Sequence, residues 1–256
     1  FCKVRGRMSV SYDFSGKKVL VTGASRGIGR AIALTLARAG AAVVALARNG
    51  EELKDLAATS KGGITPLVCD VTSSPAELAE ALSPHQPFYG LVNNAGIAAL
   101  EPVGSVTEEA LDSTFSVNFR GAFFVAQAVT NGMREHGVQG VVVNLSSQAG
   151  IKPLPSHLAY CTAKAALDMA MRVMALELGK YGIRVNAVSP TVVLTEMGRA
   201  VIFSYLMLFL VKDKNNIDKF AEVDEVTRAV CYLLSADGSC MTTGHALPID
   251  GGWTTC

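Results

Sequence analysis

The chain has 256 residues, of which half are hydrophobic and 18% are charged, and its formal net charge is +1. This composition predicts a folded protein with a large core and excludes a disordered chain. The balanced charge, without a basic stripe or an acidic tail, gives no reason to expect a nucleic-acid partner.

Cysteine spacing and hydropathy indicate a reducing compartment, and we expect a cytoplasmic protein. The six cysteines are scattered, without a Cys-x-x-Cys pair, which is typical of free thiols. The longest apolar run, Val201–Val211, is too short for the roughly 20 residues of a transmembrane helix. No apolar stretch follows the basic residues of Phe1–Arg7, so no secretory signal is expected. The four histidines lack metal-ligand spacing, and we expect no metal site.

Apolar strand-like segments alternate with helical segments along the chain. The predicted strands are Lys17–Thr22, Ala41–Ala47, Pro66–Val71, Gly90–Asn94, Val141–Ser146, Arg184–Ser189 and His245–Ile249. The predicted helices are Ile28–Ala39, Glu51–Ala58, Ala76–Leu82, Thr107–Arg134, Tyr160–Lys180 and Val223–Leu234. Strands that are apolar throughout indicate a parallel sheet buried on both faces.

These segments predict one α/β domain over residues 14–256, preceded by a poorly ordered N-terminal extension over residues 1–13. Because parallel strands need right-handed crossovers, the helices are expected on both faces of the sheet. The expected architecture is a doubly wound, Rossmann-type sheet of about seven strands.

A glycine-rich turn follows the first predicted strand and precedes the first helix. Glycines let the backbone turn tightly and approach a pyrophosphate, which the free N–H groups of a helix N-terminus attract. A tight strand–helix turn without a ligand is the alternative. The turn predicts a dinucleotide site that includes Gly23, Ser25, Arg26, Gly27, Ile28 and Gly29.

The charges near this turn favour NADP(H) over NAD(H). The second predicted strand ends in Ala47-Arg48-Asn49 and lacks the carboxylate that would bind the ribose 2′-hydroxyl of NAD(H). Arg48 and Arg26 could instead pair with the 2′-phosphate of NADP(H). The alternative is that both are ordinary surface arginines.

Two further strand ends supply candidate cofactor contacts. Asp70 closes the third predicted strand next to Val71, and its carboxylate could accept a bond from an adenine amino group or simply be exposed. Asn93-Asn94-Ala95-Gly96 closes the fourth strand, at the edge where such sheets bind ligands. The amides could line the cofactor or fasten neighbouring strands, the second role being at least as fitting for Asn93.

The fifth predicted strand ends at Ser147, and Tyr160 and Lys164 follow on one helix face. A lysine cation close to a tyrosine stabilises the phenolate and lowers its pKa from about 10, which suits acid–base work. Ser147 could hold the substrate oxygen. The three residues therefore predict a carbonyl reduction site.

The chain resembles the short-chain dehydrogenase/reductase family from about Phe14 to Gly252. The resemblance is carried by Thr22-Gly-x-x-x-Gly-x-Gly29, Asn93-Asn-Ala-Gly96, Asn118, Ser147, Tyr160-x-x-x-Lys164 and Pro190. It implies hydride transfer between nicotinamide C4 and a substrate carbon, with Tyr160 as proton donor, Lys164 on the nicotinamide ribose and Asn118 near a relay water. It also places Pro190, Val193 and Thr195 at the nicotinamide, although Thr191 stands where the family often has glycine.

Within the family, the chain is most similar to members that reduce pentuloses such as L-xylulose and α-dicarbonyls such as diacetyl with NADPH. Stretches such as His157-Leu-Ala-Tyr-Cys-Thr-Ala-Lys164 and Asn186-Ala-Val-Ser-Pro-Thr-Val-Val193 carry this similarity. It implies a homotetramer and a substrate pocket lined by Gln148, Leu154 and His157. From its chemistry alone, His157 is as well explained as a packed or surface histidine.

Val201–Asp218 departs from that pattern because it is strongly apolar where these reductases carry a polar substrate-covering helix. A lid packed on the core, an altered substrate preference, a peripheral membrane contact and a differently spliced exon are alternatives. A reductase of 3-oxoacyl, polyol or steroid substrates is an alternative function. A non-catalytic NADP(H)-binding interaction protein is another, although the intact Asn118, Ser147, Tyr160 and Lys164 disfavour it.

Overall fold

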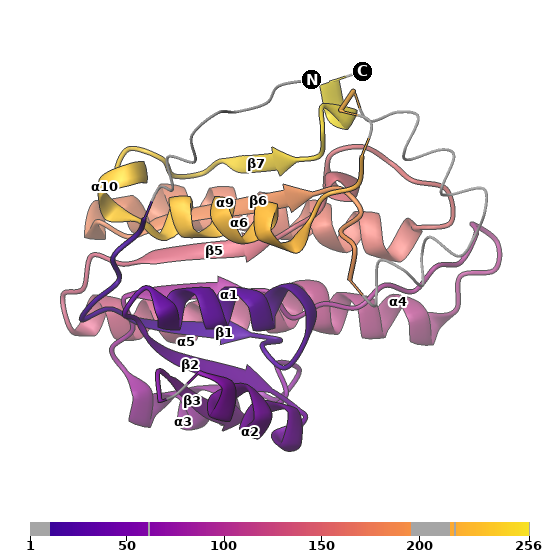
Figure 1. Ribbon diagram of the computed structural model, residues 1–256. Helices are drawn as coiled ribbons and strands as arrows, with labels where there is room; N and C mark the ends of the chain where they lie inside the picture. Colours follow the sequence, from indigo (N-terminus) through magenta and orange to yellow (C-terminus); the bar gives the residue numbers. More distant parts are fainter. Residues whose placement is uncertain (1–10, 61, 196–215, 218, 256) are drawn as a thin grey trace.

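Seven parallel strands form one sheet in the computed structural model, which describes residues 11–60, 62–195, 216–217 and 219–255. The strand order is β3-β2-β1-β4-β5-β6-β7 (Figure 1). The strands are β1 Lys18–Thr22, β2 Ala42–Ala47, β3 Ile64–Val68, β4 Gly90–Asn93, β5 Val141–Leu145, β6 Arg184–Pro190 and β7 Ala246–Ile249. The chain winds outward from β1 to β3 and then returns beside β1, so a crevice forms at the carboxyl ends of β1 and β4. The predicted doubly wound α/β class is confirmed.

Helices cover both faces of this sheet. They are α1 Gly27–Arg38, α2 Gly50–Thr59, α3 Pro75–Leu82, α4 Glu108–Phe115, α5 Ala122–Glu135, α6 Leu158–Leu178, α9 Val223–Leu234 and α10 Ala236–Ser239. Figure 1 shows α1 and α9 in front of the sheet and α5 and α6 behind it. The apolar faces of these helices therefore enclose the strands on both sides.

Two hydrophobic cores result, one on each face of the sheet. Val19 and Val21 belong to one core and Leu20 to the other, because successive side chains of a strand point to opposite faces. Val142 and its neighbour Val143 divide in the same way. This double burial explains why the central strands are apolar at every position and not at alternate ones.

The third strand lies earlier than predicted. Its register pairs Val43 with Ile64 and Ala47 with Val68, so β3 ends where its neighbour β2 ends. Asp70 consequently lies beyond the strand and does not close it. Pro66 is accommodated because β3 is an edge strand, where a missing N–H costs no ladder hydrogen bond on the open side.

The long helix predicted over Thr107–Arg134 is interrupted between α4 and α5 by a π-helical segment, Ser116–Gly121. A side chain on Gly121 would place its Cβ 2.7 Å from the Val71 carbonyl oxygen, so the segment packs closely on the chain after β3. π-helical turns are rare and depend on tertiary packing, which is why the sequence periodicity predicted one continuous helix.

Part of the predicted N-terminal extension packs on the domain. Tyr12 stacks on Phe14, with ring centroids 6.1 Å apart, and it contacts the core beside α1 and α9. This contact places Tyr12 in the domain. Residues 1–10 of the predicted extension, and residues 201–215 and 218 of the predicted apolar segment, lie outside the described residues.

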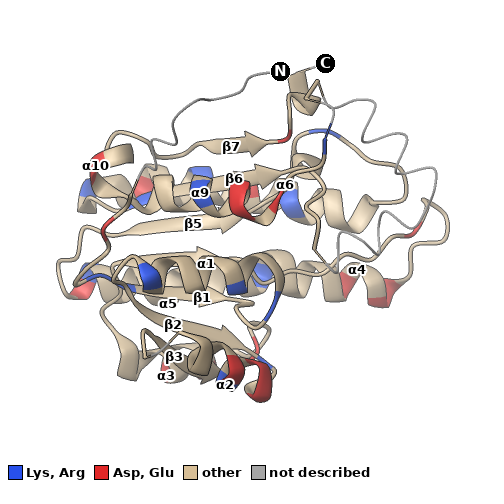
Figure 2. Cartoon of the chain, in the orientation of Figure 1, with Lys and Arg blue, Asp and Glu red and all other residues tan. Residues whose placement is uncertain are grey.

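Charged residues of both signs are spread over the helices (Figure 2). The four cysteines in the described part of the chain are free thiols. No described helix is long and apolar enough to cross a membrane. No described group of three or more His, Cys, Asp or Glu side chains could hold a metal ion.

Candidate active site

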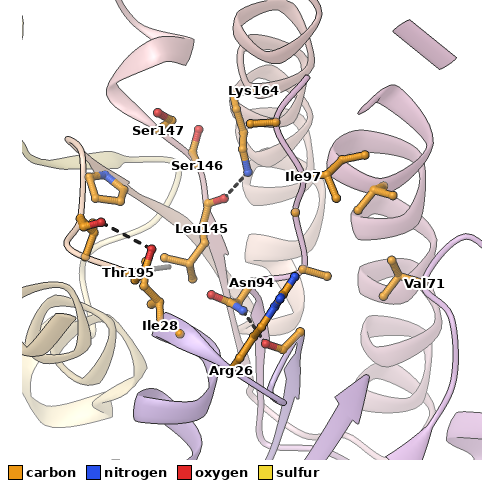
Figure 3. Close-up of a pocket in the computed structure, with 18 of the residues that line it drawn as sticks. Arg26, Ile28, Val71, Asn94, Ile97, Leu145, Ser146, Ser147, Lys164 and Thr195 are labelled. Carbon is orange, nitrogen blue, oxygen red and sulfur yellow. Dashed lines mark hydrogen bonds between the residues drawn. The ribbon is translucent and has the colours of Figure 1, made fainter. Parts of the chain in front are cut away.

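A cleft of about 870 Å³ opens at the carboxyl edge of the sheet. Its volume lies in the range of small-molecule and cofactor pockets. Figure 3 shows side chains from the turn after β1, the end of β5 and α6 around this space. The predicted site residues that line the cleft are Gly23, Ser25, Arg26, Gly27, Ile28, Arg48, Asp70, Val71, Asn94, Ala95, Gly96, Ser147, Gln148, Leu154, His157, Tyr160, Lys164, Pro190, Val193 and Thr195.

The glycine turn at the base of the cleft leaves no room for a side chain at Gly23 or Gly29. Gly23 has a φ of +63°, and a Cβ there would lie 2.9 Å from the Cα of Ala95. A Cβ on Gly29 would lie 2.3 Å from the carbonyl oxygen of Gly23 and 2.4 Å from Nδ2 of Asn94. Gly29 thus acts through packing beneath the turn and does not line the cleft.

The turn is fastened to the end of β4 by hydrogen bonds. Asn94 donates from Nδ2 to the carbonyl oxygens of Thr22 (3.0 Å) and Gly23 (3.1 Å). The hydroxyl of Thr22 accepts from the backbone N–H groups of Asn94 and Ala95. Asn93 is buried and donates to the Ala122 carbonyl and the Asn144 side chain. Both asparagines therefore join neighbouring elements, as the second alternative predicted.

The N-terminus of α1 is open for an anion. Its N-cap residue, Arg26, makes no side-chain hydrogen bond to the first turn, and no acidic residue occurs there. The backbone N–H groups of this turn and the positive end of the helix dipole therefore remain suited to a phosphate.

Arg48 and Asp70 lie opposite one another on the wall after β2 and β3. Their side chains approach to 3.8 Å, and that of Arg48 is 74% exposed, so the pair contributes little to stability. Oδ1 of Asp70 accepts bonds from the backbone N–H and the hydroxyl of Thr72. This bonding fixes the Asp70 carboxylate at the cleft, although the residue does not belong to β3.

Three of the four predicted catalytic residues, Ser147, Tyr160 and Lys164, come together at one end of the cleft. Ser147 follows β5, and its hydroxyl accepts a bond from the backbone N–H of Ala149 at 3.1 Å. On α6, Nζ of Lys164 lies 5.7 Å from the centre of the Tyr160 ring. Nζ donates to the Leu145 carbonyl at 2.7 Å, which aims the ammonium at the end of β5 (Figure 3).

The electrostatics differ from the predicted lowering of the Tyr160 pKa. Burial raises the pKa of Tyr160, and the hydrogen bond with Ser147 opposes this rise without overcoming it. Burial also lowers the pKa of Lys164 from 10.5 to about 8, while Asp168 opposes the fall. For both groups, loss of solvent thus outweighs the opposing interaction, which is with Ser147 for Tyr160 and with Asp168 for Lys164.

Asn118 lies beneath the cleft instead of in its lining. It is fully buried in the π-helical segment, and its side chain makes two bonds of 2.8 Å with the backbone N–H and C=O of Ile97. Both polar atoms of the amide are thereby used. Asn118 fixes the chain that carries Gly96 and Ile97 along the cleft.

The predicted substrate residues form the wall next to Tyr160. His157 is buried, and its Nδ1 lies 2.6 Å from the Pro155 carbonyl oxygen, so this nitrogen carries the proton. Its ring packs edge-on against Tyr160. Gln148 is buried as well, and its Oε1 has no hydrogen-bond partner. His157 is thus packed and also lines the cleft, which makes the two predicted alternatives compatible.

Several lining residues were not predicted. They are Leu46, Ala47, Asn49, Glu52, Cys69, Ile97, Ala98, Val117, Leu145, Ser146, Thr191 and Val192. Most are adjacent to predicted residues. They would have been found if every residue at the carboxyl end of a strand had been taken as a candidate, because such sheets bind ligands at that edge. Val117 and Glu52 lie on helical segments, and no sequence signal indicates which side of those segments faces the cleft.

Comparisons with known proteins agree with this geometry. Residues 23–254 match the family described as enoyl-(acyl carrier protein) reductase. A short-chain type dehydrogenase/reductase of Mycobacterium marinum has a TM-score of 0.88 at 33% identity, covering 96% of this chain and 98% of that one. The chain belongs to the short-chain dehydrogenase/reductase family. It is accordingly an oxidoreductase with a nicotinamide cofactor, as the resemblance implied.

Relatives within this family carry the names of two sugar reductases and of a sugar-acid dehydrogenase. L-xylulose reductase of Caenorhabditis elegans is 48% identical, covering 96% of this chain and 99% of that protein. D-erythrulose reductase of Gallus gallus is 45% identical, with coverages of 96% and 99%. A putative NAD(P)-dependent gluconate 5-dehydrogenase of Beutenbergia cavernae, solved with NADP at low occupancy, has a TM-score of 0.89 at 29% identity, with coverages of 96% and 100%.

The packing beneath the glycine turn predicts the effect of Gly29→Ala. The added methyl would collide with the Gly23 carbonyl and the Asn94 amide, so we expect a loss of about 1–3 kcal/mol in the free energy of unfolding and weaker binding of the nicotinamide cofactor. Urea unfolding and fluorescence titration measure both. Gly179→Ala is the matched control, because its Cβ meets no atom within 4 Å. Equal stability of the two variants would contradict the prediction.

The buried ammonium predicts that Lys164→Met stabilises the protein. Because the folded-state pKa of Lys164 is lowered from 10.5 to about 8, charging this group below pH 8 costs the folded state up to about 3 kcal/mol. We expect the variant to have the higher free energy of unfolding at about pH 7. This advantage should shrink as pH rises from 8 to 10.5, where the unfolded chain also loses its proton. Urea unfolding of both proteins across this range is the measurement, and a difference independent of pH would refute the assignment.

Proposed function

We propose that this protein reduces small carbonyl compounds with NADPH, with L-xylulose and α-dicarbonyls such as diacetyl as substrates. The observation that carries the proposal is the convergence of Ser147, Tyr160 and Lys164 at one end of the cleft. Relatives named L-xylulose reductase, at 44% identity for the Homo sapiens protein over 94% of this chain and 98% of that protein, support the substrate class.

The residues of the cleft fit a dinucleotide. The Cβ-free turn at Gly23 and the uncapped start of α1 suit a pyrophosphate, while Val193, Thr195 and Lys164 suit the nicotinamide half. When bound, the nicotinamide supplies the hydride. The absence of side chains on the glycines is what lets a charged ligand approach the backbone N–H groups.

The protein's own residues handle the proton and the substrate oxygen. The Ser147 hydroxyl donates a hydrogen bond to the substrate carbonyl oxygen and orients it towards Tyr160. The Tyr160 phenol then transfers its proton to that oxygen as the alkoxide forms. The Lys164 ammonium stabilises the resulting phenolate by charge attraction, which counteracts the burial that raises the pKa of Tyr160.

Asn118 contributes through the backbone in this proposal. Its side-chain atoms are both bonded to Ile97, which leaves its main chain to hold a relay water. The π-helical hydrogen-bond pattern around Asn118 shifts the carbonyls of this turn out of α-helical register. A water held there would return a proton to Tyr160 by way of Lys164.

NADPH preference rests on Arg26 and Arg48, which line the same end of the cleft. Their charges favour a 2′-phosphate, whereas Glu52 and Asp70 nearby carry the opposite sign. We infer that the two arginines determine the cofactor preference. The Arg48–Asp70 contact is long and exposed, so the Arg48 guanidinium can turn to a phosphate. The NADP held by the Beutenbergia cavernae protein supports this inference.

We also propose a homotetramer, in keeping with the family resemblance. Met169, Val173 and Leu176 recur three and four residues apart along α6 and are 55%, 47% and 83% exposed. Such an apolar stripe is a natural contact surface for a second copy of the chain.

Activity of Tyr160→Phe tests the proposed reaction. Removing the phenolic hydroxyl eliminates the proton donor, so we expect kcat to fall by about 10²–10⁴-fold while NADPH affinity stays within a few-fold. The measurement is NADPH consumption with L-xylulose, diacetyl, a 3-oxoacyl thioester and a steroid ketone, together with NADP⁺ reduction with a polyol. Turnover limited to the last three would contradict the substrate class. No turnover in the wild type with intact NADPH binding would support the non-catalytic alternative.

The double variant Arg26→Gln/Arg48→Gln tests the cofactor. Each lost charge-assisted bond costs about 1.5–3 kcal/mol, so we expect NADPH to bind at least tenfold more weakly while NADH binding changes little. Arg30→Gln is the control, since Arg30 pairs with Asp55 on the helix surface. Equal weakening of NADPH and NADH, or NADH binding more tightly than NADPH to the wild type, would overturn the preference.

A further inference from the structure

Asp168 is a buried acid for which the proposed reaction has no role. It lies one helical turn after Lys164 on α6, it is 5% exposed, and its Oδ1 has no hydrogen-bond partner. Buried carboxylates are costly unless an opposite charge or hydrogen bonds compensate them. The position of this acid next to a buried lysine is therefore the feature to be explained.

The Asp168 carboxylate lies close to the turn that follows Ser147. A Cβ on Gly150 would lie 2.9 Å from Oδ2 of Asp168 and 3.1 Å from the carbonyl carbon of Lys164. Gly150 ends the short 3₁₀ helix Gln148–Gly150, which is capped by the Ser147 hydroxyl. The Asp168 carboxylate thus lies between α6 and this turn, in the space that a side chain on Gly150 would need.

The charges around this acid come from α6. Lys164 and Arg172 act on Asp168, and Asp168 acts on Lys164. The groups that neighbouring elements present are neutral: the Ser146 hydroxyl, the Leu145 carbonyl and the backbone of Gly150. Because Arg172 is exposed while Lys164 and Asp168 are both buried, the attraction between the two buried groups is the less screened one.

We propose that Asp168 is a positioning residue of the reaction, whose carboxylate, buried one helical turn from Lys164, keeps Lys164 in its ammonium form. Burial alone would make the Lys164 pKa lower still, and Asp168 is the group that opposes this fall. Asp168 thereby holds the cation on which the Tyr160 phenolate depends. This inference rests on the proposed reduction, in which Lys164 works as a cation.

Asp168→Asn removes the charge and keeps the shape. We expect the pKa of Lys164 to fall by about one unit or more from its value of about 8. The measurement is an NMR titration of ¹³C-labelled lysines, with the Lys164 signal assigned by its absence in Lys164→Met. The basic limb of the pH profile of kcat/KM should move down by the same amount, whereas a purely structural role would scale the rate equally at every pH.

Glu177→Gln is the matched control. Glu177 lies on the same helix but is exposed, so its loss changes the net charge equally and should leave the Lys164 titration in place. An unchanged Lys164 pKa in Asp168→Asn, or an equal shift in Glu177→Gln, would overturn the inference. The Lys164 titration is measured without turnover. A failure of the proposed reaction would instead appear as inactivity of the wild type on the substrate panel, so the two failures can be distinguished.

If Asp168→Asn does not fold, the effect of Lys164 on the pKa of Asp168 gives a second test. Coupled groups shift one another equally, so Lys164→Met should raise the pKa of Asp168 further above its usual value. The carboxyl carbon of Asp168, followed by ¹³C NMR in wild type and in Lys164→Met, reports this shift. Identical titrations in the two proteins would refute the inference.

Discussion

The site depends on the close approach of β1 and β4 at their carboxyl ends. The chain reverses its winding direction between these strands, and a crevice opens there only if the turn after β1 folds tightly against β4. Gly23 and Gly29 allow that approach because neither has a Cβ, and Asn94 fixes it with bonds to two backbone carbonyls. The open N-terminus of α1 faces the cleft as a consequence of this packing.

Desolvation dominates the chemistry at the other end of the cleft. Burial opposes charge on both Tyr160 and Lys164, raising the pKa of the phenol and lowering that of the ammonium. A buried tyrosine with a raised pKa retains its proton, so neighbouring groups must favour the phenolate when the proton is transferred. In the proposed reaction Ser147 and Lys164 do this directly, and we infer that Asp168 does it through Lys164. The charge of Lys164 that this reaction requires is the one that burial disfavours.

Residue patterns predicted most of the fold and most of the site. Apolar strands such as Val141–Leu145 indicated a sheet buried on both faces, and the observed cores alternate along them accordingly. The tight turn at Gly23 and the helix that carries Tyr160 and Lys164 were predicted from spacing. The place of β3 was not, because the end of that edge strand follows the register of β2. The π-helical turn around Asn118 was not predicted, because its shifted hydrogen bonds do not change the spacing of hydrophobic residues in the sequence.

The sequence by itself determined the class of fold, the family and the residues that meet at the cleft. These follow from local signals: the period of apolar residues, glycines at the positions of closest approach, and a serine, tyrosine and lysine at fixed spacing. Only the tertiary structure decided the electrostatics. Three features depend on burial and on contacts between elements. The pKa of Tyr160 is raised, the amide of Asn118 is hydrogen-bonded to the backbone of Ile97, and Asp168 is buried beside Lys164. Charge and solvent access are properties of the packed molecule, because water is excluded only once separate elements have come together.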